Sequence, residues 1–374
     1  MLPVMRPWLG QEEADAAAQA VLSGWVAQGP RVASFEEAFA ARVGAAEGVA
    51  VTSCTTALHL ALLLAGVEPG DEVVVPSLSF IATANAVRHA GAVPVFADVD
   101  PVTANLTAKT VEAALSPRTR AVLAVHQAGV PADMADLRRT CDAFGLPVLE
   151  DAACAAGSVL RDRPVGAGAT IAAWSFHPRK LLTTGEGGML TTDDPEWAAR
   201  ARRLREHGMS VSAADRHASG STVIERYLET GFNYRMTDVQ AAIGLVQLGK
   251  LDPMVERRRR LAARYRELLR AVPDLQVVED PPYGRTNFQS FWVVLPDDFP
   301  LDRDEVLAAM LEAGISCRRG IMAAHLEPPY ADVVVDLPVT ERLTARSLVL
   351  PLFHDLTHED QDLVVGVLVA LAAR

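Results

Sequence analysis

Two side chains of opposite charge follow apolar segments in the middle of the chain. Asp151, in EDAAC (150–154), ends an apolar segment, and Lys180, in SFHPRK (175–180), follows the apolar segment 171–176. A carboxylate at the end of a buried strand is costly unless a positive group meets it. A lysine amine can form an imine with a carbonyl cofactor, and an acid can keep a pyridine nitrogen protonated, so the pair fits pyridoxal phosphate (PLP) chemistry. A salt bridge explains the same two residue types at least as well.

A hydroxyl-rich turn and an aromatic residue extend the candidate site. SCTT (53–56) lies between a predicted strand and a predicted helix, where backbone N–H groups and hydroxyls can bind an anion such as phosphate. Ordinary helix capping by Ser53 or Thr55 is an equally good explanation. Ser175 could add a hydroxyl to a phosphate site. Phe80, in PSLSF, could stack on a pyridine ring, although core packing also accounts for an aromatic residue there.

Alternating strands and helices must position these residues. Short apolar strands that alternate with helices are typical of a mostly parallel sheet with helices on both faces. Ligands bind such sheets at the carboxyl ends of the strands, which places 53–56, 77–80 and Asp151 near one rim. The predicted strands are 49–52, 72–76, 93–96, 121–125 and 147–150, and the predicted helices are 57–65, 82–89, 110–115 and 134–144.

The character of the chain changes after about residue 250. A long helix is predicted over 237–271, with an interruption at Asp252-Pro253, because proline suits the first turn of a second helix. The sequence predicts a large domain with an N-terminal arm over 1–250 and a smaller α+β domain over 251–374. The smaller domain contains one further predicted strand and one further predicted helix, 291–295 and 302–313.

Composition limits the possible partners. The 374 residues carry a formal net charge of −12, which argues against nucleic acid or an anionic membrane as the main partner. The arginine run 257–260 is interpreted as a solvated helix face. The uncharged window 48–67 has too many polar residues at its centre for a membrane helix, and the first residues lack the apolar core of a signal peptide. Four cysteines without CxxC spacing indicate free thiols in a soluble cytoplasmic protein, and no metal site is expected.

Eight motifs, in order along the chain, resemble the DegT/StrS family of sugar aminotransferases. The resemblance extends from about residue 23 to about residue 260, and eight ordered motifs are far more specific than any one of them. The motifs are SGWVAQGPRVASFEEAFA (23–40), SCTTALHLAL (53–62), GDEVVVPSLSFIATANAV (70–87), GAVPVFADVDP (91–101), HQAGVPADM (126–134), EDAACAAGS (150–158), SFHPRKLLTTGEGGML (175–190) and GFNYRMTDVQAAIGLVQL (231–248).

The resemblance implies fold type I of the PLP-dependent enzymes, with a large domain built on a mostly parallel seven-stranded sheet between helices. It implies that Lys180 holds PLP as a Schiff base and moves protons, and that Asp151 pairs with the pyridine nitrogen. The other implied roles are ring stacking by Phe80, phosphate binding by Cys54, Thr55 and Ser175, and a phosphate contact from Asn233 of the neighbouring subunit of a homodimer.

Two positions depart from the family pattern, and two more are candidates for substrate binding. Cys54 stands where the family commonly has glycine, so the phosphate turn has to accommodate a side chain. Cys154 stands where the family commonly has glutamine, and a thiol cannot make an equivalent hydrogen bond, so we assign it no role. Arg235 and His325 are candidate substrate-binding residues, although a structural role explains His325 equally well.

The resemblance implies ping-pong transamination, in which L-glutamate donates an amino group that a keto sugar then receives. By this analogy the leading substrate is a nucleotide-linked 4-keto-6-deoxyhexose, with a 3-keto sugar or a keto-cyclitol as alternatives. Lys180 has to be neutral to act as a base, and burial is expected to lower its pKa. Relatives with histidine in place of the lysine are dehydratases, and Lys180 argues against that activity. A non-catalytic regulator that retains the fold is the alternative from another functional class. The intact lysine, acid and phosphate turn argue against it.

Overall fold

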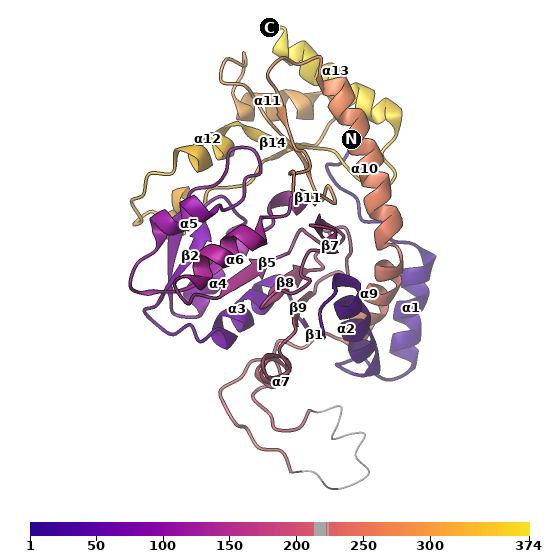
Figure 1. The fold of residues 1–374 in the computed structure, drawn as a ribbon. Helices are drawn as coiled ribbons and strands as arrows, with labels where there is room; N and C mark the ends of the chain where they lie inside the picture. Colours follow the sequence, from indigo (N-terminus) through magenta and orange to yellow (C-terminus); the bar gives the residue numbers. More distant parts are fainter. Residues whose placement is uncertain (213–221, 223) are drawn as a thin grey trace.

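A computed structural model describes residues 1–212, 222 and 224–374, and a seven-stranded sheet forms the centre of its larger part (Figure 1). The strand order is β1-β9-β8-β5-β4-β2-β3. All neighbours from β8 to β3 are parallel, whereas β9 runs antiparallel to both β8 and β1. The predicted mostly parallel α/β sheet is therefore confirmed. Its strands are β1 (Glu47–Val51), β2 (Glu72–Pro76), β3 (Val93–Ala97), β4 (Thr119–Val125), β5 (Val148–Asp151), β8 (Ala172–Ser175) and β9 (Gly188–Thr192).

Helices cover both faces of this sheet. Successive side chains of a strand point to opposite faces, so Val73 and Val75 pack with α3, α4 and α7, whereas Val74 packs with α5 and α6. Helices α2 and α9 cover the second face near Trp174. Burial on both faces explains why the central strands are continuously apolar. The helices are α2 (Pro30–Val43), α3 (Cys54–Leu64), α4 (Ala82–His89), α5 (Ala108–Ala114), α6 (Met134–Asp142), α7 (Pro195–Leu204) and α9 (Asp238–Gly249).

A second, antiparallel sheet organises the C-terminal part in the order β10-β12-β14-β13. Helices α10, α11 and α13 pack on it around one apolar core. These elements are β10 (Gln276–Val277), β12 (Phe291–Val294), β13 (Arg318–Arg319), β14 (Ser347–Leu350), α10 (Leu251–Leu269), α11 (Arg303–Glu312), α12 (Pro338–Arg346) and α13 (His358–Ala372). A small third sheet contains β6 (Val159–Leu160), β7 (Arg163–Pro164) and β11 (Gly284–Arg285). No helix among the described residues has the length and apolarity needed to cross a membrane.

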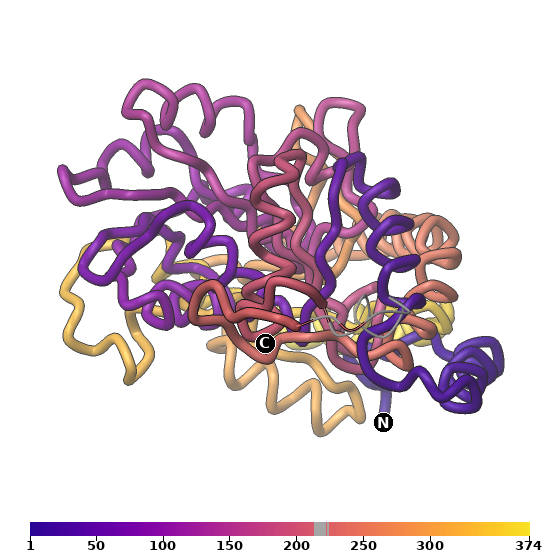
Figure 2. The backbone as a smooth tube through the Cα atoms, turned by 90° about the horizontal axis from the view of Figure 1, so that it is seen from below, coloured from indigo at the N-terminus to yellow at the C-terminus, as the bar shows by residue number. Residues whose placement is uncertain are grey.

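The first residues of the chain join the C-terminal part rather than the large sheet. The N–H of Leu2 donates to the carbonyl of Gly314 (2.8 Å), and the N–H of Ser316 donates to the carbonyl of Leu2 (2.8 Å). The N–H of Leu352 donates to the carbonyl of Val4 (3.0 Å). The chain then returns to the large sheet as α1 (Gln11–Leu22), which packs along α9. Figure 2 shows the indigo N-terminal helices grouped at one side of the molecule.

Several helix boundaries differ from the predicted ones by one to three residues, and two of the differences have a clear local cause. Helix α3 begins at Cys54, three residues early, because Ser53 caps it and accepts a hydrogen bond from the N–H of Thr56 (3.2 Å). The long C-terminal helix breaks at Lys250, between α9 and α10, and not at Asp252-Pro253. Pro253 lies in the first turn of α10, where a backbone N–H would have no acceptor within the helix, so proline is tolerated there.

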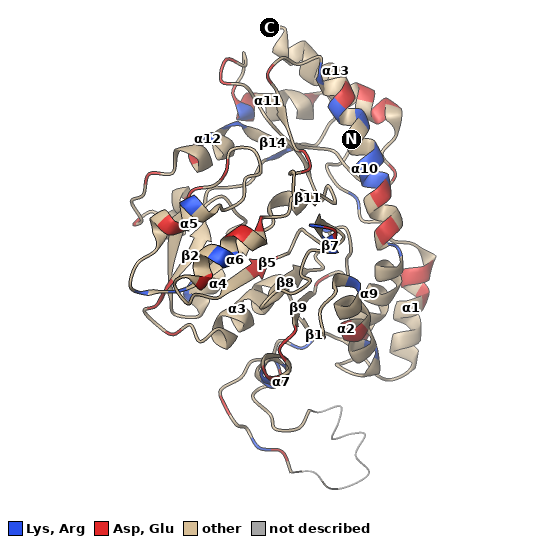
Figure 3. Ribbon diagram, in the orientation of Figure 1, with Lys and Arg blue, Asp and Glu red and all other residues tan. Residues whose placement is uncertain are grey.

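The arginine run on α10 is more than a solvated face, which corrects that interpretation. Arg258 is buried and donates to the carbonyl of Phe288 (3.0 Å), and burial lowers its pKa to about 10. Arg259 pairs with Asp280 (2.7 Å). Figure 3 shows charges of both signs along this helix. The run therefore ties α10 to the neighbouring segments of the C-terminal part.

Candidate active site

Strand direction brings the predicted residues to one rim of the large sheet. Because β9 is antiparallel to both its neighbours, β1 points the same way as β8, β5 and β2. The SCTT turn follows β1, Phe80 follows β2, Asp151 ends β5 and Ser175 ends β8. The reversal into β9 keeps the connection 176–187 at this rim, and Lys180 lies in that connection. The single antiparallel strand is thus what places the lysine beside the acid.

Asp151 is a buried acid with two fixed hydrogen bonds. It is 5% exposed, its Oδ2 accepts from Oγ1 of Thr83 (2.8 Å), and its Oδ1 accepts from the N–H of Ala153 (3.1 Å). Burial raises the pKa of the Asp151 carboxyl by more than these hydrogen bonds and the charges of Lys180 and His126 lower it. Lys180 and Asp151 form no direct ion pair in the described structure. A simple salt bridge therefore does not account for the two residues.

Lys180 contacts a cysteine instead. Its Nζ lies 3.1 Å from Sγ of Cys154, and both residues are half-buried. Burial lowers the pKa of Lys180, as predicted, but Cys154, Cys54 and Asp151 together raise it by more, so the net shift is upward. Burial thus acts on the Lys180 pKa in the expected direction, while the neighbouring groups set the direction of the net shift. All four cysteines are free, and burial raises the pKa of the Cys54 thiol.

The N-terminus of α3 offers unused donors for a phosphate. Ser53 performs the capping, so the capping alternative is right for Ser53 and does not involve Thr55. Within the described residues, the N–H groups of Cys54 and Thr55 and the hydroxyl of Thr55 have no hydrogen-bond acceptor or donor. Gly188 closes the other side, since a Cβ there would lie 2.4 Å from the carbonyl carbon of Ser53. Gly188 pairs with Ser175 in the sheet, which brings Ser175 to the same turn.

Phe80 stands apart from the core, so its core-packing alternative does not hold. It is 65% exposed, although it follows the buried strand β2 directly. Exposing a phenyl ring to water is unfavourable, and a flat partner over the rim would cover it. The ring is therefore available for stacking.

The remaining predicted residues lie at different depths. Asn233 is exposed, and its backbone pairs with that of Glu206. Arg235 is half-buried beside Val51 at the end of β1, and its guanidinium bonds to none of the described residues. His325 is 5% exposed, with Nδ1 bonded to Oγ of Ser77 (2.6 Å) and Nε2 beside Oε1 of Glu341 (3.4 Å). These two contacts favour a structural role for His325.

The residues at the rim fit PLP by their chemistry. A carboxylate has about four acceptor positions, so Asp151 keeps capacity for one more N–H after its two protein hydrogen bonds. A reactive amine, an uncovered aromatic ring and free donors at a helix N-terminus surround it. Thr83 was not identified from the sequence, and Cys154 was noted there only as a departure from the family pattern, with no role assigned. Nothing in the sequence pairs Thr83 with Asp151, a residue 68 positions away.

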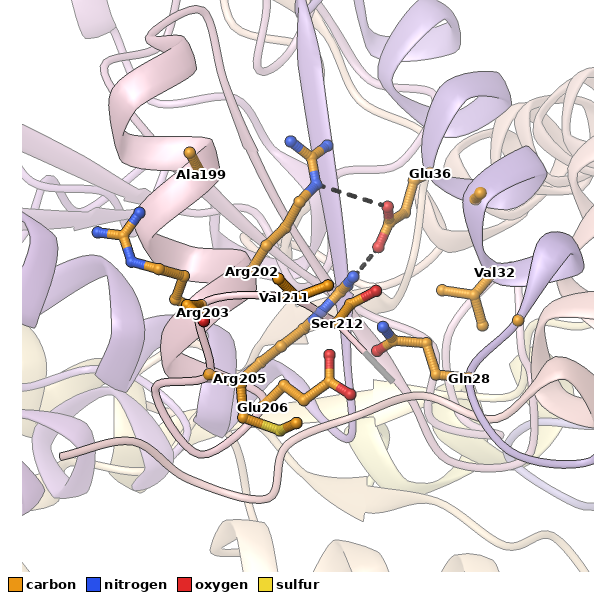
Figure 4. Close-up of a pocket in the computed structure, with 14 residues that line it drawn as sticks. Gln28, Val32, Glu36, Ala199, Arg202, Arg203, Arg205, Glu206, Val211 and Ser212 are labelled. Carbon is orange, nitrogen blue, oxygen red and sulfur yellow. Dashed lines mark hydrogen bonds and ion pairs between the residues drawn. The ribbon is translucent and has the colours of Figure 1, made fainter. Parts of the chain in front are cut away.

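A cavity of about 540 Å³ lies elsewhere, between α2 and α7, and contains neither Lys180 nor Asp151. Figure 4 shows Arg202 and Arg205 pointing toward Glu36 at its wall. Nε of Arg202 lies 3.9 Å from Glu36, and the buried Arg205 forms an ion pair with the same carboxylate. These ion pairs connect α2 to α7 across the edge of the sheet. The charged residues of the cavity therefore stabilise the fold, and we do not interpret the cavity as part of the active site.

Comparisons with known proteins show what the whole chain resembles. A sequence model described as the DegT/DnrJ/EryC1/StrS aminotransferase family matches residues 7–369. The aminotransferase TlmJ from Streptoalloteichus hindustanus is 37% identical, with a TM-score of 0.92 and 100% of this chain and 99% of that chain covered. DesV from S. venezuelae, solved in complex with a ketimine intermediate, is 35% identical, with a TM-score of 0.91 and the same coverage of 100% and 99%. DesI, solved in the presence of its TDP-sugar product, is 34% identical, with a TM-score of 0.89 and coverage of 100% and 93%.

Proposed function

Because this chain belongs to the DegT/DnrJ/EryC1/StrS aminotransferase family, we propose that it uses PLP, held by Lys180, to transfer an amino group from L-glutamate to a nucleotide-linked keto sugar. One observation carries the proposal: Lys180 and the buried Asp151 share a rim with unused phosphate donors but form no ion pair with each other. A regulator that had lost catalysis would not need this costly arrangement.

Each residue has a distinct task in this proposal. When bound, PLP supplies a ring that accepts electrons from the reacting carbon. Nζ of Lys180 would hold the cofactor until the amine of the amino donor takes its place, and the freed Lys180 amine would then be the base that takes the proton from the α-carbon of the donor and later gives it back. Asp151 holds a proton on the ring nitrogen. The N–H groups of Cys54 and Thr55, with the hydroxyls of Thr55 and Ser175, bind the phosphate, and Phe80 covers the ring.

The substrate assignment is supported by the relatives. DesI, at 34% identity, was solved with a TDP-sugar product, which supports a nucleotide-linked sugar. We propose a 4-keto-6-deoxyhexose as the sugar and Arg235 as a substrate ligand, since its guanidinium is uncommitted among the described residues. A 3-keto sugar and a keto-cyclitol are the alternatives. We also propose a cytoplasmic location, in keeping with four free cysteines.

A keto-sugar panel tests the proposed activity. The chain, loaded with PLP, is incubated with L-glutamate and each candidate ketone, and amino products are identified by mass spectrometry. Amination of a nucleotide-linked 4-keto sugar is the expected result, and amination of a 3-keto sugar or keto-cyclitol alone would select an alternative. If PLP binds but L-glutamate leaves its visible absorbance unchanged, the regulator becomes the better description.

We propose further that two subunits share each site, with Asn233 of one subunit contacting the phosphate held by the other. Asn233 is exposed and forms no side-chain hydrogen bond to the described residues, which supports a partner outside its own chain. In this proposal the Asn233–Arg235 segment as a whole serves the partner's site. Lys180→Ala chains lack the base but keep this segment, and Asn233→Ala/Arg235→Ala chains keep the base. The Lys180→Ala homodimer should be inactive and the Asn233→Ala/Arg235→Ala homodimer only weakly active, whereas mixed dimers should recover activity, up to about half of the native value by symmetry.

The control for this mixing uses a triple variant that carries Lys180→Ala, Asn233→Ala and Arg235→Ala. Mixed with Lys180→Ala chains, it provides no native lysine and should stay inactive. Subunit exchange is verified with differently tagged chains. Exchange without recovery of activity contradicts the shared site and favours the alternative that Asn233 only stabilises its own turn.

A further inference from the structure

A chain of buried hydroxyls leads to the carboxylate of Asp151. Oγ1 of Thr83, in the first turn of α4, donates to Oδ2 of Asp151 at 2.8 Å. Oγ of Ser79 lies 2.8 Å from the same Thr83 oxygen. A threonine hydroxyl has one proton, so once Thr83 donates to Asp151 it must accept from Ser79. The two hydroxyls are 1% and 2% exposed, so water cannot replace either of them.

The backbone fixes the far end of this chain. The N–H of Ser79 donates to the carbonyl of Met322 (3.0 Å), and Leu78 pairs with Ala323. Ser79 is thus held between the end of β2 and the segment that follows β13. Thr83 is β-branched, which slightly destabilises a helix. A threonine in a helix often hydrogen-bonds to the backbone of its own helix. Its hydroxyl points to the acid instead, which indicates a role at Asp151.

Two opposing effects act on the acid. Burial favours a protonated Asp151, and the hydrogen bond from Thr83 is the largest of the influences that lower its pKa. The N–H of Ala153 holds the other oxygen at 3.1 Å, so the plane of the carboxylate has one orientation. Without Thr83, Oδ2 of Asp151 would lose its only protein donor among the described residues. The effect of burial, which raises the pKa of Asp151, would then be offset less.

We propose that Thr83, supported by Ser79, is a positioning residue that keeps Asp151 ionised and turned toward the ring nitrogen of PLP. This inference depends on the proposed function, since it assigns a partner to the acid that binds the cofactor. It adds a residue that does not touch the cofactor and that acts through Asp151. The role depends on the hydroxyl group, so a serine at position 83 should preserve the function, whereas a valine should not.

The test compares Thr83→Val with Thr83→Ser and with a matched control, Thr340→Val. Thr340 is also fully buried and donates to a carboxylate at the same distance, Oδ1 of Asp98 at 2.8 Å, but outside the site. Cofactor-free protein is titrated with PLP across a pH series and followed by absorbance, and the half-reaction with L-glutamate is timed separately. Melting temperatures report the loss of stability common to both valine variants.

Thr83→Val should weaken PLP binding and slow the half-reaction by roughly tenfold or more, the loss typical of one hydrogen bond to a charged group. Removing the donor raises the pKa of Asp151, so the fall in PLP affinity on acidification should begin at a higher pH than in the native chain. Thr83→Ser should restore both values, and Ser79→Ala should have a smaller effect. Thr340→Val should melt earlier and keep the native pH profile.

Thr83→Val with native PLP affinity and a native pH profile overturns the inference, whatever its melting temperature. If Thr83→Val does not fold, Thr83→Ala provides the same comparison. Failure of the native chain to bind PLP at all would contradict the proposed function instead, so the two failures are distinguishable.

Discussion

Lys180→Ala is expected to abolish transamination while the chain remains folded. The substitution removes both the attachment point of the cofactor and the base that moves the proton, so the rate should fall by at least about a thousandfold. The large sheet should be unaffected, because Lys180 lies in the connection between β8 and β9 and, among the described residues, its amine hydrogen-bonds only to Cys154. Steady-state assays with L-glutamate, together with thermal melts, check both parts.

Chemical labelling tests the same lysine independently of turnover. The sequence contains three lysines, so borohydride reduction of the PLP-loaded chain should attach the cofactor to Lys180 and leave Lys109 and Lys250 unmodified. Lys250→Ala is the matched control. It breaks ion pairs of 2.7 Å to Glu12 and Glu13 and should lower the melting temperature without changing the label. A label on Lys109 or Lys250 would refute the assignment.

Asp151→Asn is expected to slow removal of the α-proton by roughly a hundredfold or more, because a neutral amide no longer favours the protonated ring nitrogen. PLP should still attach, since Lys180 and the phosphate turn are unchanged. Stopped-flow absorbance of the half-reaction with L-glutamate measures the effect. The control is Asp98→Asn, which alters an acid that also accepts from a buried threonine but lies outside the site. A near-native half-reaction rate in Asp151→Asn would contradict the proposed role of Asp151 at the ring nitrogen.

Local patterns predicted much of the fold. The bounds of β2 and α4 match the predicted ones, because an unbroken apolar run and a short helix before a glycine are local signals. The position of Asp151 at the rim followed from the rule for carboxyl ends of parallel strands. The reversal of β9 is not a local property, since Gly188–Thr192 is apolar in either direction. The exact placement of Lys180 beside the acid could therefore not be derived without the structure.

The side-chain partners at the site were the hardest to predict. Cys154 gave no sign that it would contact Lys180, because that contact depends on how the connection 176–187 folds back. Thr83 looked like an ordinary residue of a helix, and its partner comes from another strand. His325 could be read either way from the sequence, and its contacts to Ser77 and Glu341 depend on segments far apart in the chain.

The pairing of the N-terminal residues with the C-terminal part has a consequence for how the protein is made. Leu2 and Val4 leave the ribosome early, but their hydrogen-bond partners at Gly314, Ser316 and Leu352 are synthesised only near the end. At typical rates of synthesis the interval is on the order of tens of seconds. The large sheet can complete β1 once β9 has emerged, whereas the first five residues must stay unpaired until translation is nearly finished. Closing this long loop should be among the last steps of folding, and a nascent chain stalled before residue 314 should present its N-terminal segment to chaperones and proteases.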